Sequence, residues 1–168
     1  MQAAMTYADR PWVKNYPPGA EREIDTARVG TVVDVAREAI RTYGQNEAYE
    51  SFGKSITFAE VGRAAEAFAA ALQARGLKKG DRVALMMPNI LAYPVCIFGV
   101  LMAGCTVVNV NPLYTPRELT HQLKDSGARA IVVIENFANV VQDALKDVKL
   151  DAVIIASAGD LMGLKGQI

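Results

Sequence analysis

Apolar residues along this chain follow two patterns, helical spacing and short continuous runs. Helical spacing, together with flanking start and stop signals, predicts helices over residues 32–43, 58–75, 90–103, 116–126 and 137–145. The short apolar runs predict strands over residues 83–87, 106–110, 131–134 and 152–156. Because strands and helices alternate, we predict an α/β fold with a mainly parallel sheet and helices on both faces.

Polar residues mark where several of these helices begin. Thr31 with Asp34 at the capping-box position marks the start of the helix predicted over residues 32–43. Thr57 with Glu60, and Thr115 with Glu118, have the spacing of a capping box, in which two side chains satisfy backbone N–H groups of the first turn. Asn89 is a suitable cap for the helix predicted over residues 90–103.

Two segments lie outside the alternation of strands and helices. Residues 48–52 and 55–58 predict a β-hairpin, and the pair Gly53–Lys54 between them is typical of a type II′ turn. Residues 1–28 show no apolar periodicity and predict an extended N-terminal arm. The predicted organisation is therefore this arm followed by an α/β subdomain over residues 29–168.

The stretch between Arg82 and Arg117 contains no charged residue, and its part from Ile90 to Val108 is long enough to span a membrane. A membrane anchor is therefore one interpretation. However, prolines and asparagines, among them Pro94, divide the stretch into pieces of the length of single elements. We favour a strand, a helix and a strand buried in a parallel sheet, since strands covered on both faces are continuously apolar.

The composition indicates a globular protein of a reducing compartment. Apolar residues make up 51% and charged residues 21%, with 18 basic and 18 acidic residues, which excludes a disordered tail and a polybasic nucleic-acid binder. Cys96 and Cys105 lie in apolar runs without metal or redox spacing, so we expect buried free thiols and a cytoplasmic location. The first residues lack the apolar core of a secretion signal.

Residues with recognisable chemistry are few. Gly159, Gly163 and Lys165 come nearest to a phosphate-binding loop, but their spacing does not match one and favours a surface turn. The single histidine, His121, has charged neighbours three and four positions away, which favours a solvated helix face. The residues alone therefore predict no catalytic, cofactor-binding or metal-binding site.

Two stretches carry a family resemblance, LKKGDRVALMMPN from Leu77 and the more specific VVNVNPLYTPREL from Val107. The region from Leu77 to Val133 resembles the early part of AMP-forming acyl-CoA synthetases, and specifically bacterial long-chain fatty acid CoA ligases. The resemblance extends to ITFAEVGRAAEAFAAAL and PWVKNYPPG, and so covers essentially the whole chain.

The resemblance implies a function for a parent enzyme. The family joins a fatty acid to CoA through an acyl adenylate made from ATP with magnesium. Its phosphate loop, nucleotide contacts and catalytic lysine belong after the matching region. We therefore expect this chain to be an incomplete piece of the large N-terminal domain of such an enzyme, inactive by itself, with ATP, Mg²⁺ and CoA as cofactors of the parent only.

The resemblance also implies one substrate contact. In relatives, the loop after the strand that matches Thr106 to Val110 lies near the channel through which the pantetheine arm of CoA reaches the adenylate. Asn111, Pro112 and Leu113 would then lie at the rim of this channel. The alternative is a plain strand-to-helix connection, in which proline fixes the backbone and Asn111 bonds locally.

The alternative function is a free-standing α/β binding or interaction module without catalysis. Such a module should bury its own apolar surface, whereas a piece of a larger domain should leave an apolar patch exposed. The expected partner is the remainder of the same polypeptide, with a homodimer left open. We expect no nucleic-acid partner, and at most a peripheral association with the inner face of the membrane.

Overall fold

A computed structural model describes residues 10–23, 25, 27 and 30–163 of the chain. The chain divides into two compact units, Met1–Thr31 and Val32–Ile168. In the first unit, the segment predicted to be extended contains a short 3₁₀ helix, η2, over Pro11–Asn15. A proline in the first turn favours this helix, because its backbone dihedral is already helical and its missing N–H is not needed there.

The second unit contains the predicted alternation of strands and helices. Its elements in chain order are α2 (Val32–Tyr43), β1 (Glu47–Ser51), β2 (Lys54–Thr57), α3 (Phe58–Ala74), β3 (Arg82–Met86), α4 (Ala92–Met102), β4 (Thr106–Asn109), α5 (Pro116–Ser126), β5 (Ala130–Ile134), the 3₁₀ helix η3 (Glu135–Phe137), α6 (Ala138–Ala144) and β6 (Ala152–Ala156).

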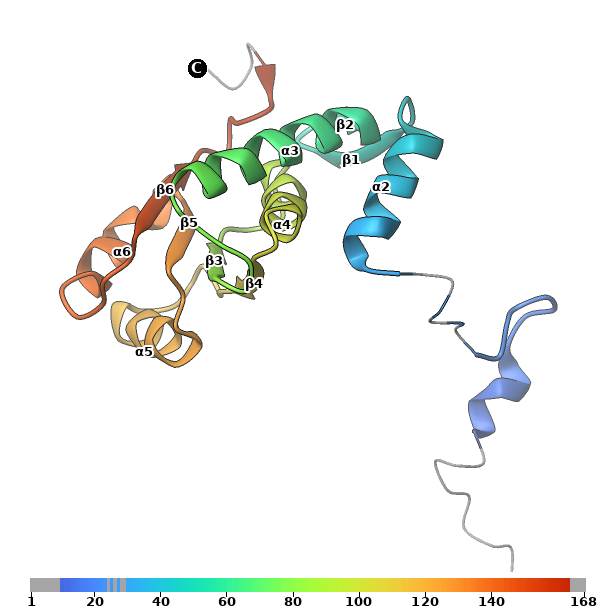
Figure 1. Ribbon diagram of the computed structural model, residues 1–168, viewed down its shortest axis with the longest axis horizontal. Coiled ribbons are helices and arrows are strands. Elements are labelled where there is room, and N and C mark those ends of the chain that lie inside the picture. Colours follow the sequence, from blue (N-terminus) through green and yellow to red (C-terminus); the bar gives the residue numbers. More distant parts are fainter. Residues whose placement is uncertain (1–9, 24, 26, 28–29, 164–168) are drawn as a thin grey trace, which may run out of the picture. The chain divides into compact units, whose positions relative to one another are not determined.

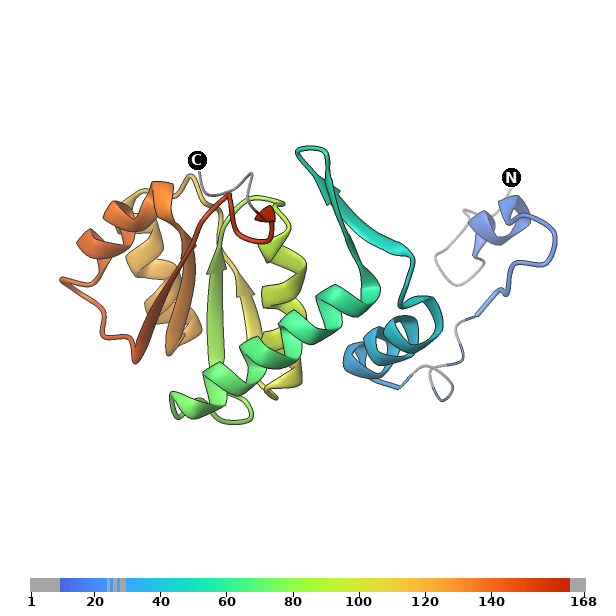
Figure 2. The ribbon, with the colours of Figure 1, turned by 90° about the horizontal axis from the view of Figure 1, so that it is seen from above.

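Four parallel strands form the main sheet, in the order β4-β3-β5-β6. Helices α3 and α4 cover one face, and α5 and α6 cover the other (Figures 1 and 2). In β3, Val83 and Leu85 face the first pair of helices, whereas Ala84 and Met86 face the second. All of β5 is buried, as its continuously apolar sequence predicts. The α/β prediction is confirmed.

The uncharged stretch of the sequence forms β3, α4 and β4 of this sheet. Helix α4 has 11 residues and buries Cys96 and Val100 against the strands. Within the described residues, no helix is both long and apolar enough to cross a membrane. The strand, helix and strand of the favoured interpretation are confirmed, and β3 is buried after Arg82. The burial predicted for the second strand is wrong: β4 lies at the end of the sheet, and its residues are half-buried or exposed.

Helix α2 begins at Val32, directly after the predicted cap Thr31, and the capping boxes predicted at Thr57 and Thr115 are confirmed. The backbone N–H of Thr57 donates to the carboxylate of Glu60 at 2.8 Å, and Thr115 pairs with Glu118 in the same way at 2.9 Å. The predicted cap at Asn89 is wrong: α4 begins after Leu91, which is helical itself and makes no side-chain cap. Tertiary packing positions this start, because Leu91 is buried in the core.

The hairpin is confirmed, but its turn lies one residue earlier than predicted. Ser51 pairs with Lys54, so Phe52 and Gly53 form the turn, with φ of 52° and 71°. Positive φ at both central residues defines a type I′ turn, not the predicted type II′ turn at Gly53–Lys54. This register buries Ile56 in the core, and a slip of the register would move that side chain to the other face.

Candidate functional site

The carboxyl ends of the parallel strands meet at one edge of the sheet. We call this region the carboxyl edge: the ends of β3, β4, β5 and β6 with the segments that follow them, which begin at Met87, Val110, Glu135 and Ser157. Open parallel sheets of α/β proteins bind their ligands at this edge, since the loops there are free to vary. It is therefore the first place to look for a site.

The predicted rim residues lie together in the loop between β4 and α5. The Oδ1 atom of Asn111 accepts a hydrogen bond from the backbone N–H of Leu113 at 3.0 Å, and its carbonyl accepts from the N–H of Tyr114 at 3.1 Å. Pro112 is half-buried, whereas Leu113 is 76% exposed. Asn111 thus bonds locally and holds a turn with an exposed apolar tip.

Asn109, the last residue of β4, links this edge to two helices. Its Oδ1 atom accepts from the hydroxyl of Tyr93 in α4 at 3.0 Å. Its backbone carbonyl accepts from the Nε2 amide of Gln122 in α5 at 2.9 Å. The sequence prediction did not single out these three residues; a polar residue that ends an apolar strand was the available signal.

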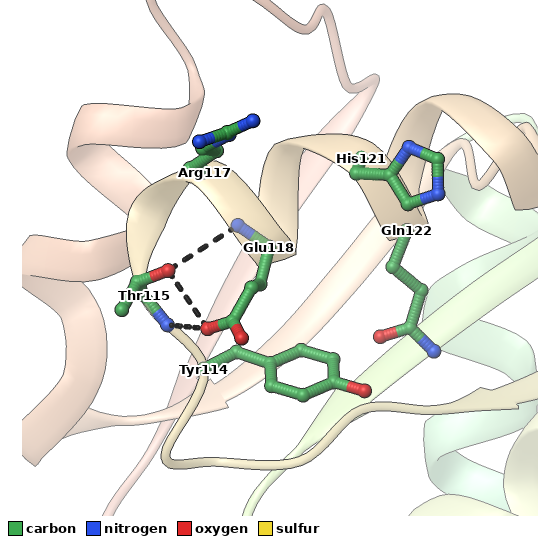
Figure 3. A pocket seen from close by; sticks show the side chains of 6 residues that line it. All are labelled: Tyr114, Thr115, Arg117, Glu118, His121 and Gln122. Carbon is green, nitrogen blue, oxygen red and sulfur yellow. Dashed lines mark hydrogen bonds between the residues drawn. The ribbon is translucent and has the colours of Figure 1, made fainter.

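A hollow of about 650 Å³ lies along α5 and the residues before it. Figure 3 shows the six residues that line it: Tyr114, Thr115, Arg117, Glu118, His121 and Gln122.

One charged group of this hollow, the carboxylate of Glu118, already forms hydrogen bonds at the start of α5. The backbone N–H and the hydroxyl of Thr115 lower the pKa of Glu118, whose carboxylate completes the capping box. His121 is exposed, as predicted, on the side of α5 away from the buried Leu119. Arg117 is an exposed cation. The hollow offers polar contacts, but in the described structure His121 makes no hydrogen bond to a nucleophile or to an orienting carboxylate.

A second hollow, of about 410 Å³, lies between β1 and the start of α4. Ile90, Leu91, Pro94, Ile97 and Phe98 give it a largely apolar wall. Such a surface suits an apolar ligand or a packed segment of chain better than a charged group.

Metal-ligating side chains do not cluster among the described residues. In the part of the chain that the structure describes, no three His, Cys, Asp or Glu side chains are placed to hold a metal ion. Of the glycine-rich run, the described residues after Ser157 form a turn in which the backbone N–H of Ser157 donates to Asp160 at 2.8 Å. Lys165 lies outside the described residues.

Residues 36–164 match the family model of the AMP-binding enzymes. The chain belongs to this family. It is 47% identical over 159 residues to the long-chain-fatty-acid–CoA ligase of Escherichia coli O6:H1, covering 94% of this chain and 28% of that protein. The family assignment confirms the resemblance found in the sequence.

Solved structures agree with this assignment to the AMP-binding enzymes. A benzoate CoA ligase from Burkholderia xenovorans LB400 matches with a TM-score of 0.69 and 29% identity, over 74% of this chain and 25% of that one. A fatty acyl CoA synthetase of Mycobacterium tuberculosis matches with a TM-score of 0.68 and 27% identity, over 74% of this chain and 26% of that one. This AMP-binding enzyme chain spans about 28% of the length of its E. coli relative.

Proposed function

We propose that this chain is part of a long-chain fatty acid CoA ligase, which uses ATP to join a fatty acid to CoA through an acyl adenylate. The observation that carries the proposal is 47% identity to such a ligase over 94% of the chain. In this proposal the 168 residues supply scaffold. In this proposal the ATP and magnesium contacts come from other parts of the protein, because the chain covers only 28% of the length of the ligase that it resembles.

Exposed apolar surface on the sheet supports a larger protein around this chain. Strand β6 lies at one end of the sheet, and its Val153 and Ile155 are 41% and 60% exposed. Both project from the face that α5 and α6 cover elsewhere, since their partners Ile131 and Val133 are buried on that face. Apolar residues gathered in this way are typical of a surface that another segment covers. We propose that the remainder of the same polypeptide covers it.

The loop between β4 and α5 is the proposed contact with CoA. Asn111, Pro112 and Leu113 lie at the carboxyl edge, and their turn presents an exposed apolar side chain. An exposed leucine on an ordered turn is suited to contact the pantetheine arm. In this proposal the enzyme acts in the cytoplasm, with at most a peripheral association with the membrane.

The proposed function is tested by thioester formation from palmitate, ATP, Mg²⁺ and CoA. We expect the complete gene product to form palmitoyl-CoA and the 168-residue chain to form none. Activity of the short chain would contradict the proposed division of labour, and an inactive gene product would contradict the function itself.

The proposed CoA contact has a matched control within the chain. Leu113 and Phe52 are 76% and 78% exposed, and both lie on turns. We expect Leu113→Ala in the complete gene product to raise the KM for CoA, and Phe52→Ala to leave it unchanged. Equal KM values for the two variants would argue that the loop is only a strand-to-helix connection.

A further inference from the structure

Asn109 occupies the point where the edge strand gives way to the loop. In the described part of the chain, β4 pairs with β3 alone, which makes it the end strand of the sheet. The backbone N–H of Val110 donates to Leu85 in β3 at 3.0 Å. Neighbouring residues of a strand direct their backbone groups to opposite sides, so the carbonyl of Asn109 faces away from β3. No further strand pairs with this carbonyl in the described part of the chain, and it is open to a donor from a side chain.

Gln122 supplies such a donor, and its own amide oxygen is left without a hydrogen bond among the described residues. Its Nε2 amide donates to the carbonyl of Asn109, while its Oε1 atom is buried and has no hydrogen-bond partner among the described residues. A buried, unpaired acceptor is unfavourable. Turning the amide over would bring two acceptors together at Asn109, so the carbonyl of Asn109 determines how Gln122 is oriented.

The side chain of Asn109 is held from the opposite face of the sheet. Tyr93 belongs to α4, whose helix covers one face, and Gln122 belongs to α5, whose helix covers the other. Asn109 is thus fixed by one hydrogen bond from each layer of helices.

The loop after Asn109 is fixed at its other end as well. The capping box of Thr115 and Glu118 holds the start of α5, and the turn of Asn111 lies between these two fixed points. Leu113 is therefore exposed at the tip of a short loop whose position is set from both ends. A shift at Asn109 would be transmitted to this tip.

We propose that Asn109, held by Tyr93 and Gln122, is a positioning residue that places the Asn111–Leu113 turn for the reaction with CoA. This inference rests on the proposed function, in which that turn borders the path of CoA. Misplacing a binding group by about 1 Å costs up to roughly 100-fold in rate. Adenylate formation does not use CoA, so the loss should be confined to the second half of the reaction.

The test compares two variants of the complete gene product with matched controls. Tyr93→Phe removes only the hydroxyl that reaches Asn109, and Gln122→Met removes the amide. The controls are Tyr43→Phe and Lys124→Met, which change exposed residues of α2 and α5. We expect kcat/KM for CoA to fall by about 10- to 100-fold in both variants, while ATP–pyrophosphate exchange with palmitate is unchanged. An unchanged kcat/KM for CoA, or an equal loss in both half-reactions, would overturn the proposal.

Hydrogen exchange separates this inference from the proposed function. In both variants the backbone amides of residues 110–114 should exchange faster than in the two controls, and equal exchange would overturn the positioning role. If the wild-type gene product forms no thioester, the proposed function fails, and the exchange measurement still decides whether Asn109 positions the loop.

Discussion

The two edges of the sheet are held together by different forces. At the amino edge, which we define by Asp81, Arg129 and Asp151 just before β3, β5 and β6, charges connect the strands. Arg129 bridges both aspartates, with its Nε atom 2.6 Å from a carboxylate oxygen of Asp151. At the carboxyl edge the described residues are joined by hydrogen bonds instead of ion pairs: Tyr93 and Gln122 donate to Asn109, and the hydroxyl of Ser157 donates to the carboxylate of Glu135 at 2.6 Å.

The two edges of this sheet therefore differ in the kind of contact that connects their segments. The ion pairs of Arg129 connect segments that are distant in sequence. At the other end, hydrogen bonds take the place of ion pairs among the described residues, next to an exposed loop and two hollows. α/β proteins commonly use their carboxyl edge for ligands, which agrees with this arrangement.

The largest effect is expected in the core that supports the amino edge. Leu72, near the end of α3, is fully buried, so Leu72→Ala should lower the free energy of unfolding by about 2 to 5 kcal/mol. Glu66→Ala, on the exposed side of α3, should change it by less than about 0.5 kcal/mol. Urea unfolding of both variants checks this difference, and equal midpoints would mean that the faces of α3 are assigned wrongly.

Phe68 should give an intermediate result in the same measurement. It is only half-buried, although its place at the centre of the apolar stripe suggests full burial. One side of its ring packs closely against α4, since a Cβ atom at Gly99 would lie 2.6 Å from Cδ1 of Phe68. Phe68→Ala should therefore cost less than Leu72→Ala, and a larger cost would contradict the packing described.

At the carboxyl edge, removing the cap at Thr115 should lower the stability of the protein, whereas replacing Asn89, which forms no cap, should not. Thr115→Ala removes a capping box and should cost about 1 kcal/mol. Asn89→Ala removes an exposed residue that makes no cap to α4, and should cost less than about 0.5 kcal/mol. Thermal unfolding of the two variants decides the point, with equal shifts counting against the observed start of α4.

The amino edge should lose stability in acid. The backbone N–H of Lys78, and then Arg129, lower the pKa of Asp81 below its ordinary value of 3.8. A carboxylate with a lowered folded-state pKa stabilises the fold above its unfolded pKa, and this contribution disappears as the pH falls through the folded pKa. The urea midpoint should therefore fall below pH 4 or so.

The variant Asp81→Asn tests whether the carboxylate of Asp81 causes this loss of stability in acid. Asp81→Asn should be less stable than the wild type at pH 6 and should lose less on acidification, while Asp125→Asn on the exposed side of α5 should follow the wild type. Parallel acid profiles for wild type and Asp81→Asn would show that the amino edge does not depend on this carboxylate.

The smallest effect is expected in the labelling of the two cysteines, whose thiols should react at similarly slow rates. Burial raises the pKa of Cys96 to about 12 and also raises the pKa of Cys105, whose thiol donates to the carbonyl of Lys78 at 3.4 Å. Both cysteines are free and buried, as predicted. Ellman's reagent should label both slowly at pH 8 and quickly in urea. Fast labelling of either thiol in the native protein would mean that its side of the sheet opens.

Local signals in the sequence predicted the elements that depend on local contacts. The capping boxes at Thr57 and Thr115 use residues three positions apart, and both lie where they were expected. The apolar runs predicted the buried strands, because a parallel sheet covered on both faces leaves few polar positions.

The remaining features depend on contacts that no local pattern specifies. The turn at Phe52 is set by the burial of Ile56, and α4 begins where Leu91 packs. Asn109 is 16 residues from Tyr93 and 13 from Gln122, so their hydrogen bonds exist only once both helices are docked. The loop of Asn111 could be located from the sequence, whereas the residues that position it could not.

Strand β6 has a consequence for handling the isolated polypeptide. Its outer backbone groups have no neighbouring strand in the described part of the chain, and Ile155 lies exposed beside them. An apolar edge of this kind is a template on which another copy can add its own strand, in the manner of early aggregates. Concentrated preparations of the 168 residues should therefore self-associate through β6, and a lysine at position 155 is the substitution best placed to keep them dispersed.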